Sequence, residues 1–127
     1  VGGFWQSDSI QMALDPENDS REGYTKDDVE IGLVLGKDQP LVYRTAPDLK
    51  PIAGEVRIKR EGTETIYEAA IPWRELGIEP PQPGKVMVIN FIVNDNDGQG
   101  RLYWMGLTPG IAEGKNPGRY HQWVFGE

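Results

Sequence analysis

Short apolar segments, each ended within a few residues by glycine, proline, asparagine or aspartate, are the feature that most restricts how this 127-residue chain can fold. Several segments alternate apolar and polar residues, which is the period of a half-buried strand. The 16 glycines and 10 prolines also favour short strands and turns over long helices. The sequence therefore predicts an all-β chain of about eight short strands.

The expected strands cover residues 9–14, 29–35, 41–44, 55–60, 65–71, 86–93, 102–106 and 122–125. Residues 55–71 form a hairpin, and Pro72–Gly77 has the proline start and glycine stop of one helical turn. The almost wholly apolar segment 86–93 indicates a strand buried on both faces, whereas 45–53, with two prolines, indicates a loop. We expect one domain over residues 1–127, an antiparallel β-sandwich of jelly-roll type.

The composition of the chain excludes some classes of partner and of metal site. A net charge of −7, with 13 Lys and Arg spread along the sequence, argues against binding to nucleic acid, which needs a basic surface. No apolar run approaches the roughly 18–20 residues of a membrane span, so no membrane association is expected. The absence of cysteine excludes disulfides and thiolate metal sites.

Trp5 lies just before the alternating segment 9–14, which presents Ser9, Gln11 and Ala13 on its polar face. An indole beside hydrogen-bonding groups can stack on the apolar face of a sugar ring while amides and carboxylates bind its hydroxyls. The alternative interpretation is an edge tryptophan that covers the core. The other tryptophans, Trp73, Trp104 and Trp123, are interpreted as core residues.

Two acidic loops offer oxygen donors suited to a hard cation such as calcium. Asp15 and Asp19 belong to the first loop, and Asp95 and Asp97 to the second, which Gly98 closes. Ordinary turn chemistry is the alternative, because Asn, Asp and Gly dominate turns. Calcium is therefore a candidate ligand of either loop.

Enzymatic activity is not expected. His121 is the only histidine, and without cysteine it cannot form a zinc site. No nucleophile-elbow motif is present. Glu30 and Glu68 could supply a carboxylate pair for glycoside hydrolysis, but nothing singles them out, and a glutamate on a strand is typical of a solvated face. A haem-binding relative of the sandwich, with His121 or a methionine as axial ligand, is a further alternative.

Several spaced motifs resemble the carbohydrate-binding modules of family 9, within the DOMON-like sandwiches. They are Trp5-x-x-Asp8-Ser9-Ile10-Gln11 with its acidic turn, Tyr67-Glu68-Ala69-Ala70-Ile71-Pro72-Trp73, Asn90-Phe91-Ile92-Val93-Asn94-Asp95, the Trp104 strand and Asn116-Pro117-x-x-Tyr120. The motifs occur in the family's order and extend over nearly the whole chain.

The resemblance implies a non-catalytic β-sandwich attached to a secreted glycoside hydrolase, often a xylanase, and an extracellular or cell-surface location. In such modules two tryptophans clamp a terminal sugar, and charged or amide groups bind its hydroxyls. Carried over to this sequence, the first clamp residue is Trp5 and the polar contacts are Gln11 and Arg101; Tyr103 is a further candidate contact. Bound calcium is also implied, as are xylan, cellulose or a related plant or microbial polysaccharide as ligand.

The chain departs from the family pattern in three places. Residues 110–114, where the second clamp tryptophan is expected, contain none, and Gly32 replaces an expected arginine. Strands that precede the Trp5 motif in the family are missing, so we expect the C-terminal part of a larger domain, or a second chain or segment that supplies them. Unpaired sheet edges would favour such pairing. The alternative function is a structural or interaction domain that has lost sugar binding.

Overall fold

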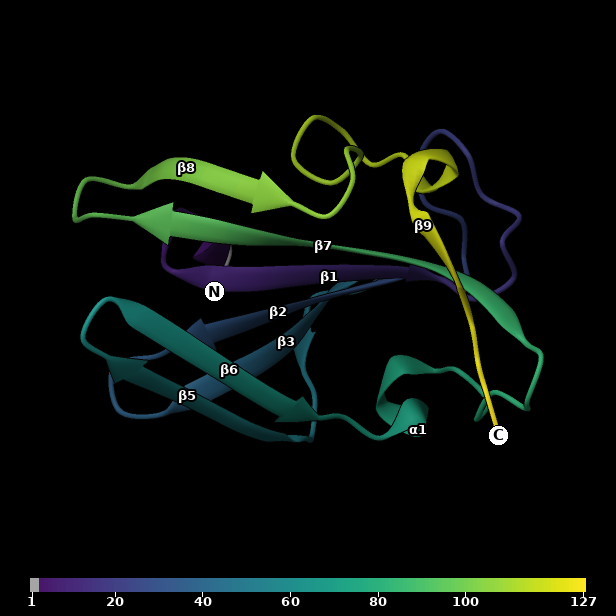
Figure 1. Ribbon diagram of the computed structural model, residues 1–127, viewed down its shortest axis with the longest axis horizontal. Helices are drawn as coiled ribbons and strands as arrows, with labels where there is room; N and C mark the ends of the chain where they lie inside the picture. Colours follow the sequence, from purple (N-terminus) through teal and green to yellow (C-terminus); the bar gives the residue numbers. More distant parts are fainter. Residues whose placement is uncertain (1–2) are drawn as a thin grey trace.

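The structure is a computed structural model and describes residues 3–127. Its main sheet has the strand order β4-β3-β2-β1-β7-β8, with β9 paired to β7, and all of these pairs are antiparallel (Figure 1). The strands of this sheet are β1 (Ser9–Asp15), β2 (Val29–Leu35), β3 (Pro40–Ala46), β4 (Lys50–Pro51), β7 (Val86–Asn96), β8 (Arg101–Gly106) and β9 (His121–Val124).

A hairpin of β5 (Glu55–Glu61) and β6 (Glu64–Ala70) forms a separate two-stranded sheet that packs on the main one (Figure 1). The one-turn helix α1 (Trp73–Leu76) follows it and ends at Gly77, whose positive φ of 72° suits a residue without a side chain. The expected all-β sandwich is confirmed. Its second layer, however, has two strands against seven in the main sheet.

The main sheet has two faces that differ in chemistry. The face toward the hairpin, called here the hairpin face, holds the larger apolar core. That core joins residues of the sheet to the hairpin and α1, and its buried members are Leu14, Val29, Ile31, Leu33, Val42, Ile52, Leu76, Ile78 and Met87. The opposite face, called here the polar face, carries Ser9, Gln11, Glu30, Asn90 and Asn94, all buried.

Strand β7 is the longest element, and two other strands pair with it along the same edge. Residues 86–89 pair with β9 and residues 92–96 pair with β8, while β1 pairs along the other edge. A loop over residues 107–120 connects β8 to β9 and contains the 3₁₀ helix η2 (Pro117–Arg119). Ile111 and Tyr120 of this segment form a small second core with Ala13, Val88 and Ile92 on the polar face.

The predicted strands agree with the structure, apart from differences at their ends: β3 continues to Ala46 and β7 to Asn96, both within segments predicted as loops. The segment 45–53 was predicted as a loop, yet Lys50–Pro51 forms the short edge strand β4 against β3. Proline is tolerated there because an edge strand need not donate every backbone N–H. The 3₁₀ helix η1 (Phe4–Gln6), which carries Trp5, was not predicted either. The prediction that 86–93 is covered on both faces is confirmed.

Within residues 3–127, none of the helices has the length and apolar character required to cross a membrane.

Candidate functional site

A row of hydrogen-bonded polar side chains, buried on β7, β1 and β2, crosses the polar face from β8 to β2. Arg101 Nη1 donates to Asn94 Oδ1 at 3.1 Å, and Asn94 Nδ2 donates to Gln11 Oε1 at 3.0 Å. Gln11 Nε2 in turn donates to Glu30 Oε1 at 2.9 Å. Buried polar groups need such partners, because an unpaired one costs about 1–3 kcal/mol. The row therefore holds each side chain in one orientation.

Glu30 is the end point of this row and the most connected group on the face. It is 3% exposed. Its carboxylate accepts from Gln11, from Thr45 Oγ1 at 3.2 Å and from the Tyr24 hydroxyl, and it pairs with Lys115 Nζ at 2.6 Å. A buried carboxylate is tolerated only when it is paired and hydrogen-bonded in this way.

Two tyrosines extend the network beneath the loop 107–120. Burial, followed by the charge of Glu30, raises the pKa of the Tyr24 hydroxyl far above its ordinary value, so the hydroxyl remains a donor to that carboxylate. Burial likewise raises the pKa of Tyr120, whose hydroxyl lies 3.1 Å from that of Tyr24 and donates to Gly110 O at 3.0 Å. The loop and the polar row are thus joined by hydrogen bonds.

Trp5 lies at the edge of the polar face on η1 and is 38% exposed. The Arg101 guanidinium carbon lies 4.7 Å from the centre of its ring, a cation–π distance. Asn96 Nδ2 donates to Gln6 O at 2.6 Å, which fixes η1 against β7. Beside Trp5, the Phe4 ring fills the space above Gly32. The indole is thus exposed and also held in place.

The sequence-predicted ligand residues divide between the two faces. Trp5, Gln11 and Arg101 lie on the polar face, where Arg101 contacts Trp5 and shares Asn94 with Gln11. Gln11 is 6% exposed and both its amide atoms are already bonded, so it supports the surface from below. Tyr103 pairs with Asp95, not with Asn94, so its side chain projects from the hairpin face.

The roles predicted for the remaining tryptophans are confirmed in one case of three. Trp73 packs against the core and meets Phe125 edge-on at 5.8 Å. The prediction that Trp104 and Trp123 are core residues was wrong, since they are 39% and 44% exposed. Trp104 lies on β8 and Trp123 on β9. Both strands pair with β7, and no other strand within residues 3–127 pairs with either of them.

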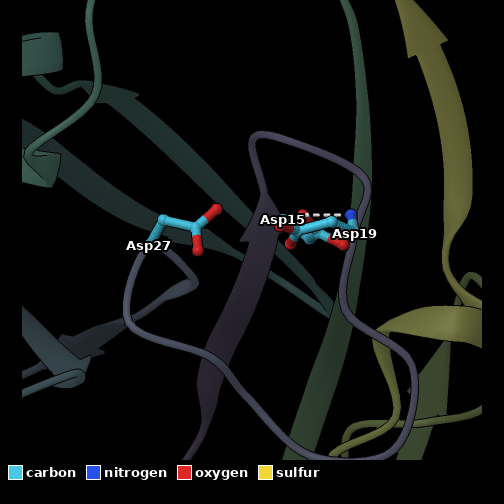
Figure 2. Close-up of side chains that lie close together, drawn as sticks. All are labelled: Asp15, Asp19 and Asp27. Atoms are coloured by element: carbon cyan, nitrogen blue, oxygen red, sulfur yellow. Dashed lines mark hydrogen bonds between the residues drawn. The ribbon is translucent and has the colours of Figure 1, made fainter.

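The predicted acidic residues Asp15 and Asp19 form a group with Asp27 (Figure 2). One carboxylate oxygen of each lies within 4.8 Å of the other two. Asp15 is buried and accepts from the backbone N–H groups of Asp19 at 3.3 Å and Ser20 at 3.0 Å. Figure 2 shows the Asp27 carboxylate pointing toward that pair from the other side of the loop.

Asp28 adds a fourth carboxylate to this region. Its Oδ2 accepts from Ser20 Oγ and from Thr25 N, both at 2.6 Å, whereas its buried Oδ1 has no partner. Asp27 Oδ2 is likewise buried without a partner. Burial raises the pKa of Asp28; these hydrogen bonds lower it, and the charges of Asp15 and Asp27 raise it further. The loop thus concentrates negative charge and leaves oxygen lone pairs free.

The other predicted acidic loop lies at the far end of the strands. Asp15 pairs with Val88, whereas Asp95 follows Asn94, the partner of Ser9. Asp95 and Asp97 are exposed, and the acidic group found within residues 3–127 does not include them. Asn96 supplies the turn chemistry there, since its Oδ1 accepts from Gly98 N at 2.7 Å and Gly100 N at 3.1 Å.

The structure contradicts the expectation for Glu30 as part of a solvated strand face. Glu30 is buried on the polar face, while Glu68 lies exposed on β6 of the other sheet, so the two do not form a pair. A signal was present, because a glutamate inside the apolar run of residues 29–35 requires a buried partner. Nothing in the sequence spacing indicated that the partners would be Tyr24 and Lys115.

Comparison with solved structures supports the fold. Two structures of a family 9 carbohydrate-binding module from Caldicellulosiruptor kristjanssonii, one in complex with glucose and one with cellotriose, match with TM-scores of 0.74 and 0.75 at 19% identity. The matches cover 100% and 99% of this chain but 63% and 61% of those chains, so the chain spans less than two thirds of their length. A search of curated proteins found no match.

The comparison with family models identifies one family over most of the chain. The family described as "Carbohydrate family 9 binding domain-like" matches residues 2–120, which is most of the chain. This range contains Trp5, Arg101, the polar row and the acidic group. The family resemblance first indicated by the spaced motifs is therefore confirmed: the chain belongs to the carbohydrate family 9 binding domain-like family.

Proposed function

We propose that the polar face binds carbohydrate through Trp5 and Arg101. The observation that carries this proposal is an exposed indole held by a guanidinium, above a row of buried side chains whose hydrogen bonds are satisfied. The apolar face of a pyranose can stack on the indole, and Arg101 can donate to sugar hydroxyls. Asn94 and Gln11 would position Arg101, while Tyr103 would contact only a ligand that reaches the other face.

Family membership supports a wider role. We infer that the domain is a non-catalytic module of a secreted, extracellular or cell-surface glycoside hydrolase, and that it brings this enzyme to a plant or microbial polysaccharide such as cellulose or xylan. The two solved relatives were obtained with glucose and cellotriose, which supports glucose-based sugars as the first probes. Binding modules act by proximity, so no catalytic group is required of this chain.

Trp5→Ala is expected to weaken binding to soluble cello- or xylo-oligosaccharides by about tenfold or more, since a tryptophan in a binding site commonly contributes over 1.4 kcal/mol. Isothermal titration calorimetry measures the effect. Because Trp5 is partly exposed, the fold should survive, and circular dichroism checks this.

Trp123→Ala is the matched control. Trp123 is similarly exposed but pairs with Met87 and so projects from the hairpin face. Unchanged binding is expected for this variant. If the folded wild-type protein binds neither oligosaccharide series nor a broader glycan panel, the carbohydrate-binding proposal is wrong.

We also propose that Asp15, Asp19 and Asp27 bind calcium. Hard oxygen ligands suit this ion, which takes six to eight of them, and the unpartnered oxygens of Asp27 and Asp28 are buried at the same loop. A cation there would offset the repulsion among the carboxylates. It would also link Asp15 and Asp19, at the start of the loop between β1 and β2, to Asp27 at its end. Its role would be to stabilise the fold, because the group lies at the opposite end of β1 from Trp5.

Calcium at about 100 times its dissociation constant is expected to stabilise the protein by about 2.7 kcal/mol. Asp27→Asn should lose most of this gain, yet be at least as stable as the wild type in chelator, because one repelling charge is removed. Thermal unfolding with calcium and with chelator measures both effects. Asp97→Asn, in the other acidic loop, is the control; an equal calcium response in Asp27→Asn and the wild type would contradict the assignment.

A structural or interaction domain is the second candidate function. The observation that favours it is the hairpin, a two-stranded sheet to which no further strand within residues 3–127 is paired. Open strand edges invite pairing with another strand. Under this proposal an additional segment or chain would extend the β5–β6 sheet. Such pairing is compatible with sugar binding, because the hairpin covers the face opposite Trp5.

A further inference from the structure

Trp104 is a second exposed indole on the polar face. It pairs with Asn94 across β7 and β8, and paired residues in neighbouring strands project from the same face. The Asn94 side chain lies on the polar face, bonded to Ser9 and Gln11, so Trp104 projects there too. Trp104 is 39% exposed, which is close to the value for Trp5.

Arg101 lies between the two indoles. It pairs with Asn96, two residues along β7 from the partner of Trp104, which corresponds to a spacing of about 7 Å along the strand. Its guanidinium contacts the Trp5 ring and donates to Asn94, the residue opposite Trp104. Trp5, Arg101 and Trp104 therefore lie on the same face near the paired ends of β7 and β8, and are called here the two-tryptophan surface.

The loop that follows β8 supplies no aromatic residue to enclose this surface. Residues 107–119 contain no Trp, Tyr or Phe, and the Tyr120 that ends the segment is buried, with its hydroxyl bonded to Gly110 O. The exposed indoles near Arg101 therefore come from η1 and from β8, on one face of one sheet. No aromatic residue of this loop could cap a sugar stacked on Trp5.

Resting on the proposed carbohydrate function, we propose that the two-tryptophan surface binds an internal stretch of a linear polysaccharide, with one sugar ring on each indole. A single terminal sugar would use only one indole and leave the other exposed. A chain that passes across both indoles gains a second stacking contact, with Arg101 placed to donate to hydroxyls between the two rings. The ligand class is a linear glycan that continues past the site in both directions.

The test compares glucose, cellotriose and cellohexaose, and the matching xylose series, by isothermal titration calorimetry. Affinity should rise with chain length and should be unchanged when the reducing end of the longest sugar is chemically reduced. Trp104→Ala should weaken binding of the hexasaccharides by about threefold to tenfold, the range expected for one aromatic contact, and leave monosaccharide binding unchanged. Trp104→Phe keeps a ring and should recover part of the affinity.

The outcomes separate this inference from the proposed function. If monosaccharides bind as tightly as hexasaccharides and reduction of the chain end abolishes binding, the site recognises chain ends; the inference is then overturned while the carbohydrate function stands. The same conclusion follows if folded Trp104→Ala binds hexasaccharides normally. Absence of binding to any of these sugars by the folded wild-type protein would overturn both.

Discussion

Replacing Glu30 with alanine is expected to lower the free energy of unfolding by about 2–5 kcal/mol. The carboxylate accepts from Gln11 and Tyr24 and pairs with Lys115, so its removal leaves the buried Gln11 amide without its acceptor and leaves the Tyr24 hydroxyl only that of Tyr120, 3.1 Å away. Each unsatisfied buried donor costs about 1–3 kcal/mol. Lys115 is partly exposed, so its freed charge can be hydrated, which reduces its share of the loss.

Urea unfolding followed by circular dichroism measures this loss. Glu30→Gln keeps an acceptor oxygen for Gln11 and should recover part of the stability. Glu68→Ala, on the exposed strand β6, is the control and should stay within about 0.5 kcal/mol of the wild type. A Glu30→Ala variant as stable as this control would mean that the network contributes nothing to the fold.

Gly32→Ala is expected to displace η1 and to weaken sugar binding together with stability. An alanine Cβ at this position would lie 2.1 Å from the nearest ring carbon of Phe4, far inside van der Waals contact. Overpacking of this kind costs about 1–3 kcal/mol. Because Trp5 is adjacent to Phe4 on η1, displacement of the Phe4 ring is expected to disturb the indole, so calorimetry should show weaker oligosaccharide binding as well as a lower melting temperature.

A double-mutant cycle with Phe4→Ala isolates the cause. Without the Phe4 ring, the additional methyl at position 32 has space, so the cost of Gly32→Ala should largely disappear on that background. Gly126→Ala, where the new methyl meets nothing within 4 Å, is the control. Equal costs of Gly32→Ala with and without the Phe4 ring would exclude the steric explanation.

The strands could be predicted from the sequence because their signals are local. Alternation located β1 and the hairpin, and the continuous apolar run located the central strand β7. The 3₁₀ helix η1 could not be predicted from periodicity, since three residues contain no period. Strand β4 was missed because its two residues, Lys50 and Pro51, are defined only by their pairing with β3.

The candidate site was only partly predictable, because a face depends on register between distant strands. The resemblance grouped Trp5, Gln11 and Arg101, which the structure brings together, but the sequence could not show that Arg101 and Tyr103, two residues apart on β8, project from opposite faces. That division follows from the bulge between Asp95 and Asn96, which changes the register by a residue. The position of Asp27 beside Asp15 and Asp19 could not be predicted either, because it depends on the path of the loop that connects β1 to β2.

The pairing of both β8 and β9 with β7 has a consequence for protein engineering. Each of the two strands is anchored to β7 independently, so the connection between them does not set the register of either. The exposed tip of that connection, Glu113-Gly114, can therefore accept inserted residues while the flanking core residues Ile111 and Tyr120 are retained. New recognition loops grafted at this tip would extend from the loop that follows Trp104 without a change to the scaffold.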